Sequence, residues 1–384
     1  GMTTEKFDLI VIGAGPGGYV AAIRASQLGM KVACVDRRST LGGTCLNVGC
    51  IPSKALLNAS EQFAKATDGT LADLGISVGT PKLDLGRMQV AKDDIVSGLT
   101  GGINYLFKKN KITRLEGTAR IDHAGEVSLV DGSDKGSYHC DRILIATGSH
   151  ASSLPNVAID EKRIVSSTGA LALTTLPKKL VVIGAGYIGL ELGTVWARLG
   201  AEVEVIEFLP RILPGMDEEV AKKFMAIAKR QGLKFRLKTA VKSAKASKTG
   251  VSLMVEPAGG GDEEQIDADV ALVSVGRHPA TNGLGLEEAG VAVSDRGRIK
   301  VDPRFETSLP ARLPTTFSTA AVRALSSATA EMTSAEISPR RRACSSRNAV
   351  IIRSIACNRP FAATAPANLT VKASAPACSR IAVI

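Results

Sequence analysis

The chain of 384 residues lacks three features that would each indicate a particular class of protein. No stretch approaches the roughly 18 consecutive apolar residues of a membrane-spanning helix, which argues against an integral membrane protein. The residues before the first apolar strand are few and polar and do not resemble a signal peptide, so we expect a cytoplasmic location. No metal site is predicted, because no metal-ligand spacing links the four histidines, His123, His139, His150 and His278.

Cysteine is also scarce, with seven residues in the whole chain. An odd number in a chain of this length argues against a secreted fold held together by disulfides. Cys34 and Cys140 lie in or beside apolar segments that are predicted to be strands, so we expect them to be buried and inert. Cys45 and Cys50 differ from them, because they lie five residues apart in a glycine-rich segment.

The spacing of Cys45 and Cys50 allows a disulfide only on a distorted helical turn. Five residues of straight α-helix rise about 7.5 Å, whereas the two Cα atoms of a disulfide lie within roughly 7 Å. Gly43, Gly49 and Pro52 would permit this distortion near a helix start. A helix N-terminus stabilises a thiolate, so one sulfur would be a nucleophile or an electron donor. Taken alone, the spacing also fits a structural disulfide or two free buried thiols.

A glycine-rich turn lies upstream of this pair, between an apolar strand and a helix. The strand Phe7–Ile12 runs into Gly13–Gly18, an alanine-rich helix follows to Gly29, and the next strand ends at Asp36. In this order of elements a GxGxxG sequence binds a dinucleotide, with the pyrophosphate at the helix N-terminus and the acid on the adenosine ribose. The three motif glycines would make the tight turn, admit the pyrophosphate and allow close helix packing.

The same pattern returns 171 residues later. The strand Lys179–Ile183 leads into the turn Gly184–Gly189, and the strand after the next helix ends at Glu207. The offset holds at five positions, which pair Gly13 with Gly184, Gly15 with Gly186, Gly18 with Gly189, Gly29 with Gly200, and Asp36 with Glu207. Two dinucleotide sites, the first beside a cysteine pair, predict electron transfer between a cofactor, a dithiol and a second nucleotide.

The segments between these motifs show simpler periodicities. Leu85–Lys109 is predicted to be a helix that packs on the first domain, from apolar residues at Val90, Ile95, Leu99, Ile103 and Leu106. Between Ile112 and Ile145, and again from Val241 to Val275, short alternating stretches separated by turn residues predict antiparallel β-meanders.

The segment Gly42–Lys54, with the sequence GGTCLNVGCIPSK, resembles the redox motif of the pyridine nucleotide-disulfide oxidoreductases. Within that group it is most similar to the dihydrolipoamide dehydrogenase family, and the resemblance extends from about Phe7 to Ser308. It implies an α/β fold with two Rossmann-like domains, one for FAD and one for NAD, with β-meander insertions. It also implies a C-terminal dimerisation domain, which we expect to be missing or replaced here.

The resemblance further implies the domain limits. Residues 1–150 would form the FAD-binding domain with the redox disulfide, and residues 275–308 would partly complete it. Residues 151–274 would form the NAD-binding domain, inserted into the first. Residues 309–384 match nothing in the family.

Four residues receive catalytic roles from the resemblance. Cys45 would be the outer sulfur, which forms a mixed disulfide with a dithiol substrate, and Cys50 the inner sulfur, which faces the flavin. Lys54 lies one helical turn after Cys50 and would direct its charge toward the flavin, paired with Glu191. The alternative for Lys54 and Glu191 is two solvated charges. Tyr187 would be either a gate where nicotinamide enters or a packed side chain.

The predicted cofactor contacts follow from the same motifs. The expected FAD-binding residues are Gly13, Gly15, Pro16, Gly17, Gly18, Asp36, Arg37, Gly43, Thr44, Cys45, Lys54, Gly117, Ala119, Thr147, Gly148 and Ser149. The expected NAD-binding residues are Gly184, Gly186, Tyr187, Ile188, Gly189, Glu191, Glu207, Val241, Gly276 and Arg277. A carboxylate at Glu207 accepts hydrogen bonds from a ribose 2′-hydroxyl and repels a 2′-phosphate, which favours NAD over NADP.

The composition changes abruptly after Ser308. All 38 glycines precede this point, and residues 309–384 hold ten Lys and Arg against two acidic residues. The net charge of +11 therefore belongs mostly to this tail and is poor evidence for nucleic-acid binding. The family's acid-base histidine is absent, since no histidine follows His278. We interpret the tail as an out-of-frame or otherwise foreign reading; the alternative is a divergent disordered or interaction segment.

The predicted function is oxidation of a dihydrolipoyl dithiol through Cys45 and Cys50 and FAD, with hydride transfer to NAD. The partner would be a lipoyl carrier protein or free dihydrolipoamide, within a 2-oxoacid dehydrogenase or glycine-cleavage complex, and the family forms homodimers. We expect no nucleic-acid or membrane partner. The alternatives are a disulfide reductase of the glutathione or mercuric type, and a truncated FAD- and NAD-binding protein without full activity.

Overall fold

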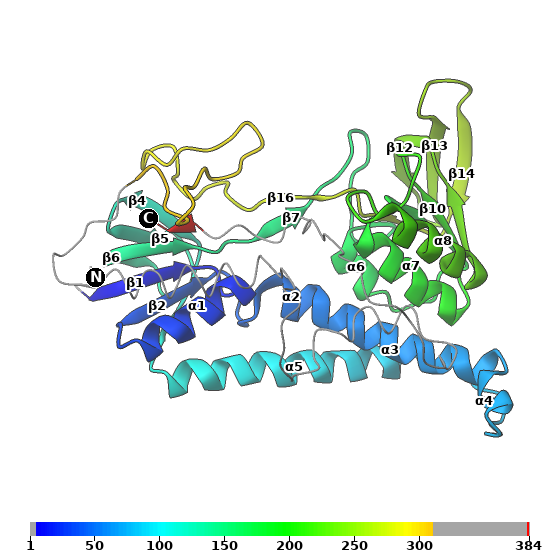
Figure 1. Ribbon diagram of the computed structural model, residues 1–384, viewed down its shortest axis with the longest axis horizontal. Coiled ribbons are helices and arrows are strands. Elements are labelled where there is room, and N and C mark those ends of the chain that lie inside the picture. Colours follow the sequence, from blue (N-terminus) through cyan, green and yellow to red (C-terminus); the bar gives the residue numbers. More distant parts are fainter. Residues whose placement is uncertain (1–4, 310–381, 384) are drawn as a thin grey trace, which may run out of the picture.

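The computed structural model describes residues 5–309 and 382–383. Figure 1 shows two sheet-containing lobes, with helices α3 (Cys50–Thr67) and α5 (Leu85–Lys109) running beneath them. A two-stranded ribbon of β7 (Ser149–Ala151) and β16 (Arg277–Pro279) joins the lobes on the opposite side. No helix in the described residues is long and apolar enough to cross a membrane.

The first lobe is built on a sheet in the order β3-β2-β1-β6-β5-β4. Strands β3, β2, β1 and β6 pair with one another in parallel, and β5 and β4 continue the sheet beyond β6 in antiparallel fashion. The helix α1 follows the first glycine turn. These elements are β1 (Lys6–Ile12), α1 (Pro16–Gln27), β2 (Val32–Asp36), β3 (Thr113–Glu116), β4 (Ala119–His123), β5 (Glu126–Leu129) and β6 (Gly136–Ile145).

The second lobe repeats the plan with a parallel sheet in the order β11-β10-β9-β15-β8. Its elements are β8 (Ile164–Val165), α6 (Ser167–Leu171), β9 (Lys179–Ile183), α7 (Tyr187–Leu199), β10 (Glu202–Ile206), α8 (Glu218–Arg230), β11 (Leu233–Arg236) and β15 (Val270–Val273). An antiparallel sheet of β12 (Thr239–Ala246), β13 (Val251–Pro257) and β14 (Glu264–Ala268) lies beside it. The predicted α/β fold with two Rossmann-like units and meander insertions is therefore confirmed.

The meander predicted between Ile112 and Ile145 is wrong in two places. Strand β3 pairs parallel with β2, and only the first part of β6 belongs to the antiparallel meander. Because β6 is ten residues long, it extends past β5, and Arg142–Ile145 continue beside β1 in parallel register. One strand thus serves both the meander and the nucleotide-binding sheet, which sequence alternation alone does not reveal.

The helix predicted at Leu85–Lys109 is confirmed as α5, but its predicted buried face is only partly correct. Val90, Ile95 and Leu99 are about half exposed. The helix instead buries Leu85, Gln89, Lys92, Thr100, Ile103 and Phe107. Three of these are polar, and two of the three find partners on the second lobe: the Gln89 amide donates to the Leu173 carbonyl at 2.9 Å, and the Lys92 ammonium donates to the Leu171 carbonyl at 3.2 Å.

The two lobes share one hydrophobic core at their junction. Leu56 of α3 and Leu85 of α5 pack in the same cluster as Val182 of β9 and Trp196 of α7. Leu56 and Trp196 are fully buried there. The helices that follow the cysteine segment therefore fix the first glycine turn relative to the second.

The chain returns to the first lobe after β15. The backbone amide of Ile121 donates to the Leu284 carbonyl at 2.8 Å, and Leu284, Leu286 and Val291 pack into the first-lobe core. The domain limits at residues 150, 274 and 308 remain predictions. Most of the tail whose origin was predicted to be foreign, residues 310–381 and 384, lies outside the described residues. The described pair Ala382–Val383 (β17) lies antiparallel to the end of β6.

Candidate active site

The cysteine pair joins two helices that meet at a glycine. Cys45 lies in the short helix α2 (Gly43–Val48), Gly49 breaks the helix with φ −145° and ψ −113°, and Cys50 begins α3. The break brings the Cα atoms to 4.6 Å, within disulfide range, and Cys45 and Cys50 are bonded. The predicted distortion is thus a change of helix rather than a bent first turn. Cys50 occupies the N-terminal position that favours a thiolate.

Exposure does not distinguish the two sulfurs in the way the resemblance implies. Cys45 is half-buried and packs on the core cluster that contains Leu46, whereas Cys50 is exposed. The assignment of Cys45 as the outer sulfur and Cys50 as the inner one therefore rests on the resemblance and stays a prediction.

The first glycine turn contacts the cysteine segment directly. A Cβ on Gly43 would lie 2.4 Å from the Cα of Gly15, and the Gly42 amide donates to the Ala14 carbonyl at 2.9 Å. Gly43 also has φ +59°, which favours glycine. Asn47 holds the loop through donation to the Gly43 carbonyl at 2.8 Å. The glycines at 15 and 43 thus leave a backbone-lined surface beside the disulfide, of the kind a pyrophosphate requires.

The other residues predicted to bind FAD surround the same turn. The Asp36 carboxylate accepts from the Ala14 amide at 2.8 Å, and the Gly117 amide donates to the Asp36 carbonyl at 3.0 Å. The Ala146 amide donates to the Ile12 carbonyl at 2.8 Å, which brings the segment Thr147–Ser149 to the end of β1. Pro16 and Gly17 begin α1, Gly18 packs on the Gly13 carbonyl, Thr44 lies in α2, Ala119 begins β4, and Arg37 is exposed after Asp36.

Lys54 and Glu191 form the predicted pair. The Lys54 ammonium lies 2.8 Å and 2.7 Å from the two carboxylate oxygens of Glu191. Lys54 comes from α3, one turn after Cys50, and Glu191 comes from the second turn of α7. Their side chains are 41% and 14% exposed, so the carboxylate is the more enclosed partner. The alternative of two solvated charges is wrong for this structure.

The second glycine turn repeats the hydrogen bonds of the first. The Glu207 carboxylate accepts from the Ala185 amide at 2.7 Å and from the Leu209 amide at 2.9 Å. The Asp36 carboxylate likewise accepts from the amides of Ala14 and Arg38. These three residues lie 171 positions before Glu207, Ala185 and Leu209. Glu207 is nearly buried but keeps lone pairs for further donors, because a carboxylate has about four acceptor positions.

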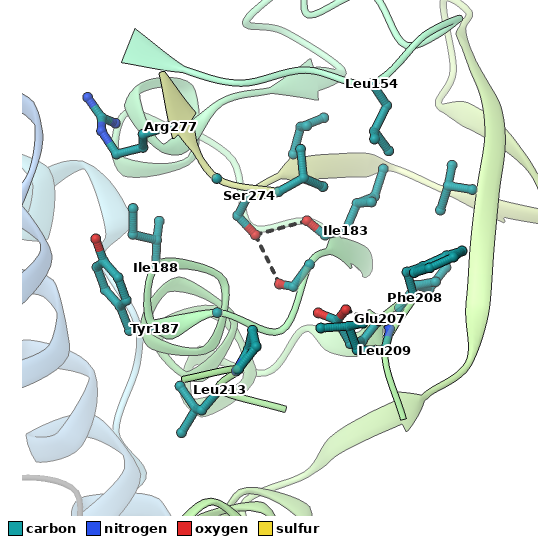
Figure 2. Close-up of a pocket in the computed structure, with 18 of the residues that line it drawn as sticks. Leu154, Ile183, Tyr187, Ile188, Glu207, Phe208, Leu209, Leu213, Ser274 and Arg277 are labelled. Carbon is teal, nitrogen blue, oxygen red and sulfur yellow. Dashed lines mark hydrogen bonds between the residues drawn. The ribbon is translucent and has the colours of Figure 1, made fainter. Parts of the chain in front are cut away.

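A cavity of about 820 Å³ opens beside this second turn. Figure 2 shows Glu207, Phe208 and Leu209 on one side of it and Tyr187 and Ile188 on the side of the N-terminal helices. Most of the residues predicted to bind NAD line it, namely Gly184, Gly186, Tyr187, Ile188, Glu207, Val241, Gly276 and Arg277. A Cβ on Gly186 would meet no atom within 4 Å, so this glycine leaves free space at the helix start.

Two predicted NAD contacts do not line the cavity. Gly189 packs against the turn, where a Cβ would lie 2.3 Å from the Gly184 carbonyl oxygen, and Glu191 pairs with Lys54. The sequence prediction also missed apolar lining residues in the segment after Glu207, including Phe208, Leu213 and Met216. Ser274 was not among the predicted contacts either; its hydroxyl donates to the carbonyls of Ile183 and Gly184, as Figure 2 shows.

Arg277 connects the second site to the first. Its guanidinium donates to the Ser149 hydroxyl at 2.8 Å and to the Ser149 carbonyl, across the β7–β16 ribbon. On the same ribbon, the rings of His150 and His278 lie 5.8 Å apart. Burial, together with the charges of Arg37 and of His278, lowers the pKa of His150 below its ordinary value.

The other two cysteines of the described chain take no part in the disulfide. Cys34 and Cys140 are free and buried, as predicted. Burial raises the pKa of the Cys34 thiol strongly and that of Cys140 to about 12, so both stay protonated at neutral pH. Within the described ranges, no group of three or more His, Cys, Asp and Glu side chains is placed to hold a metal ion.

The profile of the family described as pyridine nucleotide-disulphide oxidoreductase matches residues 7–311. The chain belongs to this family. It is 54% identical to the leghemoglobin reductase of Vigna unguiculata over 311 residues, which is 80% of this chain and 58% of that protein. It is 52% identical to the mitochondrial dihydrolipoyl dehydrogenase of Pisum sativum over 311 residues, 80% of this chain and 61% of the relative.

A bacterial relative gives the same result. The chain is 54% identical to dihydrolipoyl dehydrogenase 3 of Pseudomonas aeruginosa over 298 residues, 77% of this chain and 63% of that protein. Among solved structures, the flavoprotein disulfide reductase RclA of Escherichia coli, in a Cu(II) complex, superposes with a TM-score of 0.70 at 25% identity, covering 87% of this chain and 72% of the other. The chain spans about three fifths of the length of the curated relatives it matches.

Proposed function

We propose that the chain is a flavoprotein disulfide oxidoreductase of the dihydrolipoyl dehydrogenase type, with FAD at the first glycine turn and NAD at the second. The observation that carries the proposal is the role of α3 as a link. Its first residue, Cys50, belongs to the disulfide, and one turn later Lys54 pairs with Glu191 on the helix of the second turn. The redox pair is thereby connected to the second glycine turn through α3 and to the first through the contact of Gly43 with Gly15.

The residues at the first turn fit FAD. The close contact of Gly15 with Gly43 leaves backbone amides accessible for a pyrophosphate, and Asp36 is held at the end of β2 where an adenosine ribose would lie. When bound, the flavin would supply two-electron transfer between the cysteine pair and a nicotinamide. The charge of Lys54, positioned by Glu191, would favour the reduced flavin.

The dithiol chemistry belongs to the two cysteines. A substrate thiolate attacks Sγ of Cys45, a mixed disulfide forms, and the Cys45–Cys50 bond breaks to leave a Cys50 thiolate. The second substrate thiol, after losing its proton, attacks the mixed disulfide and releases Cys45. The substrate leaves as a cyclic disulfide, the enzyme pair holds the two electrons, and the substrate's protons pass to Cys45 and to solvent.

The second site is proposed to bind NAD rather than NADP. Glu207 is nearly buried at the cavity wall, with its carboxylate fixed by two backbone amides. A 2′-phosphate there would lie against a carboxylate that cannot turn away, whereas a 2′-hydroxyl can donate to it. Tyr187, on the cavity side nearest the N-terminal helices, is proposed to be the gate through which nicotinamide approaches the flavin.

The substrate class follows from the relatives. Two of them are named dihydrolipoyl dehydrogenase, and one of these is mitochondrial. We therefore propose a dihydrolipoyl group, on a carrier protein or as free dihydrolipoamide, and a place in a 2-oxoacid dehydrogenase or glycine-cleavage complex. A cytoplasmic location remains the prediction for this chain.

The test is spectroscopic. Purified full-length chain, supplied with FAD, should show the visible absorption of bound flavin, which should bleach on anaerobic addition of dihydrolipoamide and, separately, of NADH. Absence of bound flavin would overturn the proposal. Flavin that bleaches with NADH but not with dihydrolipoamide would favour a binding protein without full activity, and turnover of glutathione disulfide or Hg(II) instead would favour the other reductases.

A further inference from the structure

The second glycine turn lies against a serine hydroxyl that the first turn lacks. Ser274 follows β15, and its backbone amide donates at 2.8 Å to the Ile183 carbonyl, at the end of β9. Ala146 has the same place in the first lobe, because its amide donates at 2.8 Å to the Ile12 carbonyl, at the end of β1. Ile12 and Ile183 are themselves 171 residues apart. Alanine therefore occupies the position in the first lobe that serine occupies in the second.

The Ser274 hydroxyl contacts the strand end, the turn and the start of α7. Its Oγ donates to the carbonyl oxygens of Ile183 at 3.0 Å and of Gly184 at 3.1 Å. A Cβ on Gly189, in the first turn of α7, would lie 2.5 Å from the same Oγ. Glycine at position 189 therefore lets α7 begin directly against this hydroxyl. A group in this position influences where the helix N-terminus lies, and amides at a helix N-terminus are the groups that bind a pyrophosphate.

The first turn is supported by other contacts. A Cβ on Gly43 would lie 2.4 Å from the Cα of Gly15, so the cysteine segment packs closely against this turn from outside. The Cys34 thiol also lies 4.0 Å from the Gly13 carbonyl oxygen. A Cβ on Gly186, the counterpart of Gly15, would meet no atom of the described chain within 4 Å, because the cavity opens there. The second turn therefore lacks this outer support and has the Ser274 hydroxyl on its inner side.

We propose that Ser274 is a positioning residue for the nucleotide at the second turn. Its hydroxyl holds the open turn in the shape that binds a pyrophosphate before the nucleotide arrives. The inference rests on the proposed function, in which this turn binds NAD. A site that is ordered in advance binds more tightly, because fewer groups have to be immobilised when the ligand binds. Ser274 therefore affects the affinity for NAD and not the rate of hydride transfer.

The test compares binding and turnover of NAD in Ser274→Ala and in the wild-type chain, both full length and loaded with FAD. The Kd for oxidised NAD, from calorimetry, and the KM for NAD in dihydrolipoamide oxidation should both rise about threefold to tenfold, as expected for one lost hydrogen bond. The kcat should change by less than about twofold, because the hydroxyl acts on binding alone. Ser274→Cys keeps the shape of the side chain but is a weaker donor, so it should give a smaller rise than Ser274→Ala.

Hydrogen exchange tests the positioning role directly. Without nucleotide, the backbone amides of residues 186–189 should exchange faster in Ser274→Ala than in the wild-type chain. The amides of residues 15–18, at the first turn, should exchange equally fast in both. Saturation with oxidised NAD should reduce the difference at the second turn, because the bound nucleotide then orders the turn itself.

Thr194→Val is the matched control. Thr194 lies on α7, the helix of Gly189, and its hydroxyl also donates to a backbone carbonyl, that of Leu190 at 2.7 Å. The variant removes a buried hydroxyl from the same helix but outside the turn. It should lower the thermal midpoint without changing the Kd for NAD or the exchange of residues 186–189.

Three results would overturn the proposal: an unchanged Kd and KM in Ser274→Ala, an equal rise of the Kd in Thr194→Val, or a lower kcat at unchanged KM. Each of them leaves the proposed NAD site intact, because the wild-type chain still binds NAD. If the wild-type chain held FAD but bound no NAD, the proposed second site and this inference would both be wrong.

Discussion

Gly13 and Gly184 begin two turns that have nearly the same backbone but different surroundings. Their φ angles are +102° and +100°, and each amide donates at 2.8 Å to a carbonyl of the neighbouring strand, that of Val35 in β2 or that of Ile206 in β10. The repeat extends beyond the sequence motif: the Gly42 amide donates to the Ala14 carbonyl, and 171 residues on the Leu213 amide donates to the Ala185 carbonyl, both at 2.9 Å.

The surroundings separate the two turns. The first is in contact with Gly43 and the helix that carries Cys45, whereas the second opens onto a large cavity. Pro16 begins the helix of the first turn, and its counterpart Tyr187 lines the cavity at the second. The strand–turn–helix geometry alone therefore does not decide the chemistry, which depends on the residues that other segments bring to each turn.

The largest effect is expected from removal of the disulfide, which lies beside the first turn and has no counterpart at the second. Cys45→Ser or Cys50→Ser should abolish dihydrolipoamide oxidation, with a loss of about 1000-fold or more, because no disulfide remains to accept the electrons. Steady-state rates measure this, and flavin absorption should persist. Cys140→Ala, at a buried thiol outside the site, is the control. Substantial activity in both serine variants would contradict the assignment.

Alanine in place of Gly13 or Gly184 should damage the nucleotide site at that turn and leave the site at the other turn intact. A Cβ on Gly13 would lie 2.3 Å from the Ala146 carbonyl oxygen, and a Cβ on Gly184 would lie 2.6 Å from the Ser274 carbonyl oxygen. Both glycines also have a positive φ, which strains any other residue. We expect about 2–4 kcal/mol of destabilisation from each. Gly13→Ala should lose FAD, and Gly184→Ala should lose NADH affinity while flavin absorption remains. Gly29→Ala, with positive φ but no atom within 4 Å, isolates the backbone strain. A shared loss of both cofactors would show that the turns are not independent.

A smaller effect should distinguish the roles of the two equivalent acids, Glu207 and Asp36. Glu207→Gln keeps the shape of the side chain but removes the charge, so NADPH should gain on NADH by about tenfold in kcat/KM. Asp36→Asn, at the equivalent position of the first turn, should leave this ratio unchanged and weaken FAD retention. An unaltered ratio in Glu207→Gln would mean that the carboxylate does not contact the ribose.

The Lys54–Glu191 pair should affect rate more than stability. Because the Lys54 side chain is 41% exposed, its loss should change the free energy of unfolding by at most about 1 kcal/mol. Lys54→Met should lower kcat about tenfold by removing charge near the flavin. Glu191→Gln should have a similar but weaker effect. Lys65→Met, which removes the half-buried pair that Lys65 forms with Glu61 within α3, is the control and should change neither quantity by much.

The smallest effect concerns the ribbon that joins the two sites. Because burial and nearby arginines lower the pKa of His150, the folded chain binds its proton less readily than the unfolded chain. Stability should therefore fall slightly as the pH drops below the ordinary value of 6.5, toward the lower folded pKa. His150→Gln should reduce that dependence in urea unfolding measured from pH 7 to 5. A histidine NMR midpoint at or above 6.5 would contradict this.

Much of the fold was predictable because its signals are local. Apolar strands that end at glycine, and acids that end the next strand, predicted both turns, and the resemblance of Gly42–Lys54 to a redox motif predicted the bridge between Cys45 and Cys50. The contact of Gly15 with Gly43 was not predictable, since it joins segments that only the folded chain brings together. The exposure of Ile95 and Leu99 was missed for a related reason: the periodicity showed a helix, but Gln89 and Lys92 found buried partners that redirected its inner face.

The cavity lining shows the same limit. Glu207 was predicted from its place at a strand end, but Leu213 and Met216 reach the cavity from an irregular segment with no periodic signal. Leu213 adopts φ +49°, unusual for leucine, in order to place its amide against the Ala185 carbonyl. Sequence patterns do not encode such positions, because the hydrogen bond that fixes them is tertiary.

The burial of Leu56 and Leu85 among second-lobe residues has a consequence for unfolding. The second lobe does not close the cluster around Trp196 alone, since this cluster includes side chains from residues 56 and 85 as well as from the strands after residue 164. Denaturation should accordingly follow a single transition, reported alike by the lone tryptophan and by far-ultraviolet circular dichroism. Hydrogen exchange in β9 and in α3 should slow down together when either nucleotide binds, because both elements open as one unit.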